Sequence, residues 1–391
     1  MSLSRAYLDH NATSPVRPEV VAAVVRALEL PGNPSSIHRE GRAAKGALEA
    51  ARARVAALVG AGRGRVVFTS GGTEAANAVL SGALTRVGYP APTRLLIGAT
   101  EHPCVSAGHR FPPETVEIVP VDGTGLIDLA ALERSLERAG DEAVLISVHA
   151  ANNETGVIQP LAAVVALAKA HGRALVHSDA VQAVGKMPLD VEALGLDALT
   201  LSGHKFAAPK GTGAIVLAEG VVLDRAFIRG GGQEARQRCG TENLPGLAGL
   251  GEAARIARAR LAGIDAGLRD LSLRDSVEAA LLAIAPDAVV FGSGAPRLPN
   301  TLCFSVPGLD AATALMALDL AGVAISSGSA CSSGKVARSS VLAAMGVSPA
   351  LAAGALRVSF GWNSEESDGA RFLTAFERHV ATLYQRRGYA A

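Results

Sequence analysis

The chain has 391 residues, of which 49% are hydrophobic and 19% are charged, and this favours two folded domains over a disordered chain. Its 37 basic and 36 acidic side chains leave a net charge of +1, and no run of five or more like charges occurs. The composition therefore argues against nucleic acid and acidic membranes as partners, and it favours small molecules.

Short apolar runs alternate with longer helical patterns through the first part of the chain, which is typical of parallel βα units. Helices are predicted at residues 128–138 and 161–170, because apolar residues recur there at helical spacing. Together the runs predict an α/β fold with a mostly parallel, seven-stranded sheet. Its strands are expected at residues 65–69, 94–99, 116–120, 143–149, 174–179, 197–202 and 213–218.

A second, smaller α/β domain is predicted toward the C-terminus. After about Gly246, long helical stretches rich in Ala, Leu and Arg are followed by three further apolar runs, AVVFG, TLCFSV and LRVSF. The turn between the domains is expected near Gly263. We assign residues 14–262 to the large domain, and residues 1–13 with 263–391 to the small domain.

Polar motifs follow several of the predicted strands, where open α/β sheets bind ligands. TSGGTEAAN follows the first strand and opens a helix, so Gly72 would let the backbone approach an anion and Thr73 would add a hydroxyl. The alternative is an ordinary turn in which Thr73 caps the helix. No GxGxxG occurs, and residues 328–335 depart from the P-loop spacing, so the motif is interpreted as a separate kind of phosphate cup.

Asp179 ends one predicted strand, and Lys205 follows another in the string SGHKF. A buried carboxylate needs a cationic partner and a buried lysine amine becomes nucleophilic, which are the two groups that a pyridoxal phosphate enzyme uses to hold its cofactor. The alternatives are a helix cap for Asp179 and a solvated lysine for Lys205. Gln182 is a candidate donor to the ring's phenolic oxygen, and Ser202 with His204 are candidates for phosphate.

Three further residues are candidates for the same site. His102 follows the strand at 94–99, where its imidazole would stack on a flat ring or carry protons, although a structural histidine is the alternative. Asn153, in ANNETG, follows the strand at 143–149 and is a candidate to bind the ring's oxygen or the substrate carboxylate. Arg357, in LRVSF, would bind a substrate carboxylate through two hydrogen bonds, unless it forms a structural salt bridge.

The four cysteines show no CxxC spacing and do not indicate a disulfide framework. Cys331 lies in SSGSACSSGK, whose small polar residues predict an exposed loop and an accessible, nucleophilic thiol. A free cysteine more often fills an apolar gap, which is our interpretation of Cys303 in TLCFSV. The sequence leaves Cys104 and Cys239 undecided.

The start of the chain, MSLSRAYLDH, lacks the long apolar core of a secretory signal. The longest uncharged stretch, residues 339–356, contains three serines, two glycines and a proline, which suits a membrane span poorly. We therefore expect a soluble protein of the cytoplasm.

Taken together, the motifs resemble those of cysteine desulfurases of the NifS/IscS type, in the class V aminotransferase group of fold-type I pyridoxal phosphate enzymes. The resemblance runs nearly from end to end. It is carried by YLDHNATSP, GNPSSIH, FTSGGTEAAN, TEHPCV, NNETGVIQP, HSDAVQAVGKMPLD, LSGHKFAAPKGTGA, GGGQE, RCGTEN and SSGSACSSG.

The resemblance implies a binding site for pyridoxal 5'-phosphate. Lys205 would carry the cofactor, Asp179 would pair with its pyridine nitrogen, Gln182 with its phenolic oxygen, and His102 would stack on the ring. Phosphate would be held by Gly72, Thr73, Ser202 and His204. Thr241, in RCGTEN, would reach the phosphate from a neighbouring subunit, which implies a homodimer with shared active sites.

The resemblance also implies the reaction. L-Cysteine would be held by Asn153 and Arg357, Lys205 would accept its α proton, and Cys331 would attack the substrate sulfur to give a persulfide and L-alanine. The sulfur would pass to an iron–sulfur scaffold or another acceptor protein, with Cys331 as a transient iron–sulfur ligand. The alternatives are a selenocysteine lyase or another class V aminotransferase, and a non-catalytic sulfur carrier that uses Cys331.

Overall fold

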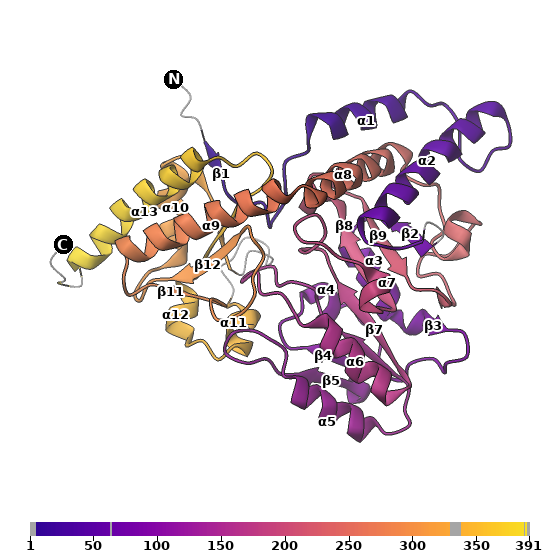
Figure 1. Ribbon diagram of the computed structural model, residues 1–391, viewed down its shortest axis with the longest axis horizontal. Helices are drawn as coiled ribbons and strands as arrows, with labels where there is room; N and C mark the ends of the chain where they lie inside the picture. The colour runs from indigo at the N-terminus through magenta and orange to yellow at the C-terminus, as the bar shows by residue number, and fades with distance from the viewer. Residues whose placement is uncertain (1–4, 63–64, 329–337, 387, 389–391) are drawn as a thin grey trace.

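The computed structural model describes residues 5–62, 65–328, 338–386 and 388 (Figure 1). A seven-stranded sheet of order β2-β9-β8-β7-β6-β4-β5 forms its centre. Its strands are β2 (Val66–Thr69), β4 (Arg94–Gly98), β5 (Val116–Val119), β6 (Val144–Ser147), β7 (Ala174–Asp179), β8 (Ala198–Ser202) and β9 (Gly213–Leu217). The predicted α/β fold with a seven-stranded, mostly parallel sheet is thus confirmed.

Strand β9 runs antiparallel to both of its neighbours, β2 and β8, whereas the other described pairings in this sheet are parallel. A direct return of this kind needs no crossover helix, and the connection from β8 to β9 contains only the 3-10 turn Gly203–Phe206. Because two antiparallel steps restore the direction, β2 points the same way as β8.

Helices cover both faces of the central sheet. Alternate strand residues point to opposite faces, so Val144 and Ile146 join one hydrophobic cluster and Leu145 joins the other. The first cluster includes residues of α1 (Pro18–Leu28), α2 (Arg39–Leu58), α5 (Leu129–Ala139), α6 (Leu161–His171), α7 (Val191–Leu194) and α8 (Leu244–Ala262). The second includes residues of α3 (Gly72–Ala78), the π-helical turn Val79–Ala83 and α4 (Pro103–Ser106).

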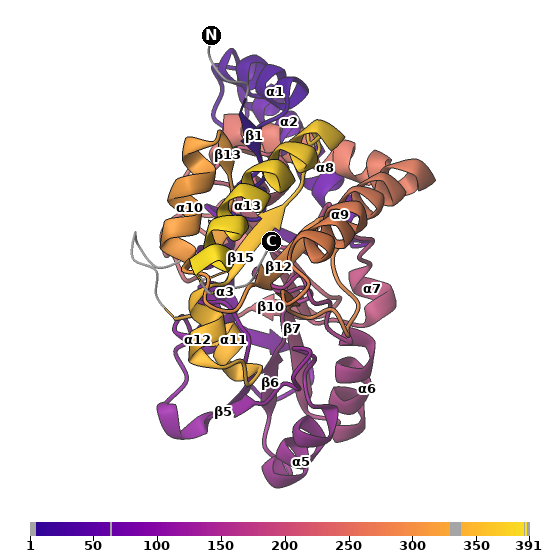
Figure 2. The ribbon, with the colours of Figure 1, turned by 90° about the vertical axis from the view of Figure 1, so that its left-hand side faces the viewer.

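A smaller antiparallel sheet of order β11-β12-β15-β14 lies beside the first (Figure 1). Its strands are β11 (Val289–Val290), β12 (Thr301–Ser305), β14 (Ser326–Ser327) and β15 (Leu356–Ser359). It shares a hydrophobic cluster with α9 (Ile264–Ile284), α10 (Ala311–Leu320) and α13 (Glu366–Arg386), the elements in front in Figure 2. The three predicted C-terminal strands are present, whereas the domain boundaries stay a prediction.

The N-terminal segment joins this second part of the molecule. Strand β1 (Ala6–Tyr7) pairs in parallel with β13 (Val323–Ala324), and Leu8 lies in the same cluster as Phe304. The remaining elements are β3 (Leu84–Arg86), which pairs with β10 (Val221–Leu223), the 3-10 turns Pro113–Thr115 and Gln233–Arg236, and the helices α11 (Ser340–Ala344) and α12 (Pro349–Ala353).

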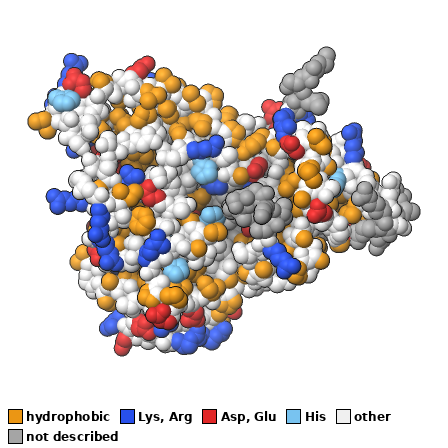
Figure 3. Space-filling view, turned by 180° about the vertical axis from the view of Figure 1, so that it is seen from behind, with side chains coloured by type: hydrophobic (Ala, Val, Ile, Leu, Met, Phe, Trp, Pro, Cys, Tyr) orange, Lys and Arg blue, Asp and Glu red, His pale blue; other side chains and the backbone are white. Residues whose placement is uncertain are grey.

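Among the described residues, none of the helices combines the length and the hydropathy that a bilayer crossing requires. Acidic, basic and hydrophobic side chains intermingle over the face shown in Figure 3, in line with the net charge of +1.

The parallel arrangement decides where polar side chains gather. Strands β2, β4, β6, β7 and β8 all point the same way, so their carboxyl ends meet at one edge of the sheet. Residues 9–13 and strand β15 reach this edge from the other part of the molecule, because Asn11 and Arg357 both contact Asn153.

Candidate active site

A cavity of about 270 Å³ lies at the carboxyl edge of the central sheet. It brings together ten of the twelve residues that the sequence predicts for the site, the exceptions being Thr241 and Cys331. Its lining is Asn11, Ala12, Gly72, Thr73, His102, Cys104, His149, Ala151, Asn153, Asp179, Val181, Gln182, Ser202, His204, Lys205 and Arg357.

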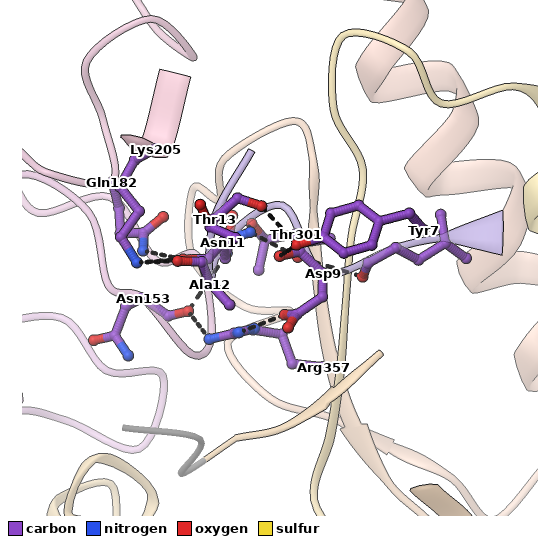
Figure 4. A network of polar contacts seen from close by, with 12 residues as sticks. Tyr7, Asp9, Asn11, Ala12, Thr13, Asn153, Gln182, Lys205, Thr301 and Arg357 are labelled. Atoms are coloured by element: carbon purple, nitrogen blue, oxygen red, sulfur yellow. Dashed lines mark hydrogen bonds and ion pairs between the residues drawn. The ribbon is translucent and has the colours of Figure 1, made fainter. Parts of the chain in front are cut away.

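Lys205 lies in the 3-10 turn that directly follows strand β8. Its Nζ donates hydrogen bonds to the carbonyl oxygens of Asn11, at 2.7 Å, and Ala12, at 2.9 Å (Figure 4). The short turn keeps the side chain at the sheet edge, and the two carbonyls hold the amine at the cavity wall. The alternative of a solvated lysine does not describe this half-buried side chain.

Asp179 ends strand β7 and is buried. Its Oδ1 accepts the N–H of Val181 at 2.9 Å, and its Oδ2 lies 3.6 Å from the Cys104 thiol, which donates to it. Burial raises the pKa of Asp179, and the nearby charge of Glu101 raises it further. Among the described residues no lysine or arginine forms an ion pair with this carboxyl, so it suits a cationic group supplied by a ligand.

His102 caps helix α4, since its Nδ1 accepts the N–H of Cys104 at 3.1 Å. Burial lowers the pKa of His102, and the opposite charge of Asp179 only partly counters this effect. A neutral imidazole with Nδ1 as acceptor carries its hydrogen on Nε2. The structure therefore gives His102 both a structural role as a cap and a place on the cavity wall.

The small and polar residues predicted to bind phosphate are among those that line the cavity. A β carbon at Gly72 would lie 2.7 Å from Val181 Cγ2, so only glycine allows the turns after β2 and β7 to pack this closely. Thr73 and Ser202 contribute hydroxyls. Burial, assisted by the charge of Lys205, lowers the pKa of His204 to about 4, so its imidazole is neutral at neutral pH.

Arg357 reaches the cavity from strand β15 and is almost fully buried. Its Nη1 donates to the carbonyl oxygen of Asn153 at 2.9 Å, and its Nη2 pairs with Asp9 Oδ1 at 2.9 Å (Figure 4). The salt bridge that was the structural alternative is thus present. The same guanidinium also lines the cavity, so the two interpretations are compatible.

Gln182 lines the cavity, but its amide is already engaged inside the protein. Its Nε2 donates to the carbonyl oxygen of Asn11 at 3.0 Å, and its Oε1 accepts from Lys186 Nζ at 2.6 Å. Asn11 therefore links Gln182 to Lys205, since one carbonyl oxygen accepts from both side chains.

Thr241 and Cys331 stand apart from these residues. Thr241 is exposed and lies in a separate pocket beside Ser70 and Arg238, outside the cavity. Cys331, with its predicted role as a transient iron–sulfur ligand, lies outside the described residues. Of the residues that are described, no group of three His, Cys, Asp or Glu side chains has the geometry to hold a metal ion.

The other cysteines are buried. Cys303, in strand β12, belongs to a hydrophobic cluster as predicted, and burial raises the pKa of its thiol. Cys239 is 4% exposed. Cys104, which the sequence left undecided, lines the cavity beside Asp179.

Two lining residues that the sequence analysis did not single out are Asn11 and His149. His149 follows strand β6, and its Nδ1 lies 3.0 Å from Oε1 of the buried Glu101. The position of His149 just after a strand end was a usable signal. Asn11 offered no comparable signal, because its place depends on how the N-terminal segment crosses to the sheet edge.

Comparison with known proteins agrees with the fold. A sequence model of the family described as Aminotransferase class-V matches residues 6–372. A protein named cysteine desulfurase from Cereibacter sphaeroides is 43% identical over 363 residues, which is 91% of each chain. Another of that name from Sinorhizobium fredii is 41% identical and covers 97% of this chain and 98% of its own.

Solved structures with similar sequences share this fold. The X-ray structure of a NifS-like protein from Rickettsia africae superposes with a TM-score of 0.87 at 32% identity, covering 96% of this chain and 99% of that one. The structure named SspA in complex with cysteine has a TM-score of 0.73 at 27% identity, covering 91% and 98% of the two chains.

Proposed function

The chain belongs to the class-V aminotransferase family and is a cysteine desulfurase, and from this premise we propose that it forms L-alanine and a persulfide on Cys331. The family implies pyridoxal 5'-phosphate as cofactor. The observation that carries the proposal is that one cavity brings together Asp179 at the end of β7, Lys205 just after β8, and Arg357 of the distant strand β15.

The residues around the cavity fit this cofactor. Asp179 is a buried carboxyl without a lysine or arginine partner in the described part of the chain, which suits a protonated pyridine nitrogen. Gly72, Thr73, Ser202 and His204 would hold the phosphate, and His102 would lie against the ring. Lys205 would hold pyridoxal phosphate in the resting enzyme, and the cofactor would withdraw electrons from the α carbon of an amino acid that replaces the lysine.

The chain's own groups would orient the substrate and move its protons. Arg357 has five N–H donors, of which the bonds to Asn153 and Asp9 occupy two, so others remain for the carboxylate of L-cysteine. Asn153 would contact the same carboxylate. Lys205 Nζ would accept the α proton once the amine is released from the cofactor, because the two carbonyls beside it keep it at the wall.

Cys331 would receive the sulfur. Its thiolate attacks the sulfur of the substrate, a new S–S bond forms and the bond from the β carbon to sulfur breaks. The β carbon then gains a proton and the α carbon regains the one that Lys205 accepted, which gives L-alanine. We further propose a cytoplasmic homodimer in which Thr241 completes the neighbouring site. The sulfur acceptor would be an iron–sulfur scaffold or another protein with a nucleophilic thiol.

Two variants, with a third as control, test the proposal. Lys205→Ala should lose the visible absorbance of the bound cofactor, whereas Lys210→Ala, at an exposed lysine of the same connection, should keep it. Cys331→Ser should keep the absorbance but lose the release of alanine from L-cysteine. Alanine release at the wild-type rate in Cys331→Ser would overturn the role of Cys331 and favour a lyase or aminotransferase mechanism.

A further inference from the structure

Residues 329–337, which include Cys331 in the sequence, are flanked on both sides by well-anchored residues. On the upstream side, Ser326 of β14 pairs with Arg357 of β15, and the N–H of Gly328 donates to the carbonyl oxygen of Ala355 at 3.3 Å. On the downstream side, Ser339 caps helix α11, because its Oγ accepts the N–H of Leu342 at 3.0 Å.

A single buried carboxyl, that of Glu154, contacts both flanks. Its Oε2 accepts a hydrogen bond from Ser339 Oγ at 2.6 Å, across 185 residues of sequence. A β carbon at Gly328 would lie 3.0 Å from the same oxygen, so this glycine packs directly against the carboxyl. Glu154 is 6% exposed and Ser339 is 4% exposed, so water competes little for the bond.

The backbone of Glu154 is fixed to the central sheet edge. The N–H groups of Glu154 and Thr155 donate to Asn152 Oδ1 at 2.8 and 2.9 Å, and Asn152 Nδ2 donates to the carbonyl oxygen of Thr100 at 3.2 Å. The preceding residue, Asn153, lines the cavity. In this turn, therefore, Asn153 lines the cavity and the next residue, Glu154, contacts both flanks.

We propose that Glu154 is a positioning residue for sulfur transfer, which ties Gly328 and Ser339 to the turn that forms the substrate side of the cavity. Glu154 is not among the residues that line the cavity. Its effect is to fix Gly328 and Ser339, which flank residues 329–337 in the sequence, relative to Asn153. This inference rests on the proposed role of Cys331 as the sulfur acceptor.

The inference is tested by measuring two steps of the reaction separately, the step at the cofactor and the transfer of sulfur to Cys331. The step at the cofactor is followed by the absorbance change when L-cysteine is added to the holoenzyme. Sulfur transfer is followed by rapid quenching, alkylation and mass spectrometry of the peptide that contains Cys331. Glu154→Ala and Ser339→Ala should slow persulfide formation about tenfold, the rate equivalent of one typical hydrogen bond, and keep the absorbance change within about twofold.

Three further variants complete the test. Ser348→Ala removes the equivalent cap of α12, whose Ser348 Oγ accepts the N–H of Leu351, and it should leave both steps unchanged. Glu154→Gln keeps an oxygen acceptor in place and should retain the wild-type rate. The double variant of Glu154→Ala and Ser339→Ala should be no slower than the slower single variant, because both remove the same bond.

Persulfide formation at the wild-type rate in Glu154→Ala or Ser339→Ala would overturn the inference, and so would an equal loss in Ser348→Ala. If the wild-type protein itself forms no persulfide on Cys331, the proposed function fails, and the inference fails with it. The wild-type measurement thus separates the two failures.

Discussion

Replacement of Arg357 by lysine tests the binding of the substrate carboxylate. The side chain is 2% exposed, and its guanidinium already joins Asn153 and Asp9, so lysine retains a charge but loses the planar pair of donors. A hydrogen bond to a charged group contributes about 1.5–3 kcal/mol, so kcat/KM for L-cysteine should fall about 10- to 100-fold, mainly through a higher KM. The assay is alanine release at several cysteine concentrations.

Arg297→Lys is the matched control, because the Arg297 side chain is only 8% exposed and pairs with a carboxylate, Glu278, but does not line the cavity. It should keep kcat/KM. Cysteamine, which lacks a carboxylate, should show an equal absorbance response in wild type and Arg357→Lys. A kcat/KM within about twofold of wild type in Arg357→Lys, or an equal loss in Arg297→Lys, would refute the carboxylate role.

Two other predictions follow from the described residues. Burial raises the pKa of Glu154 from 4.5 to about 7, so the fold binds an extra proton between these values and loses about 3 kcal/mol of stability as pH rises through them. The stability of Glu154→Gln should lack this dependence on pH. The test compares the urea unfolding midpoints of wild type and Glu154→Gln at pH 5 and pH 8. An equal change of midpoint in both proteins would contradict the burial of this carboxyl. If Thr241 serves the neighbouring subunit, mixed dimers of Lys205→Ala and Thr241→Val protomers contain one intact site and regain activity. No recovery would place Thr241 in its own subunit's site.

The central sheet was predictable because its strands contain short apolar runs between polar turns, as in residues 213–218. The two-residue strands β1, β13 and β14 were not predictable. Their pairing depends on contacts between distant segments, such as Ala6 with Val323. Two residues are also too few to show the alternation of apolar and polar side chains that predicts a strand.

The site was predictable where a residue ends a strand of the central sheet, as Asp179 does, or follows one, as Lys205 does, since such ends converge at one edge. Contacts across the two parts of the molecule were not predictable. The bond between Arg357 and Asn153 spans 204 residues, and that between Glu154 and Ser339 spans 185. Nothing in the local pattern of either residue indicates its partner.

The most direct test of the central claim is to follow the sulfur atom itself. The holoenzyme is mixed with one equivalent of L-cysteine labelled with radioactive sulfur, quenched after a single turnover, digested without reductant and analysed peptide by peptide. We predict label on the peptide that contains Cys331, with L-alanine released in equal amount. Label on the peptides of Cys104, Cys239 or Cys303 instead, or alanine without protein-bound label, would contradict the account.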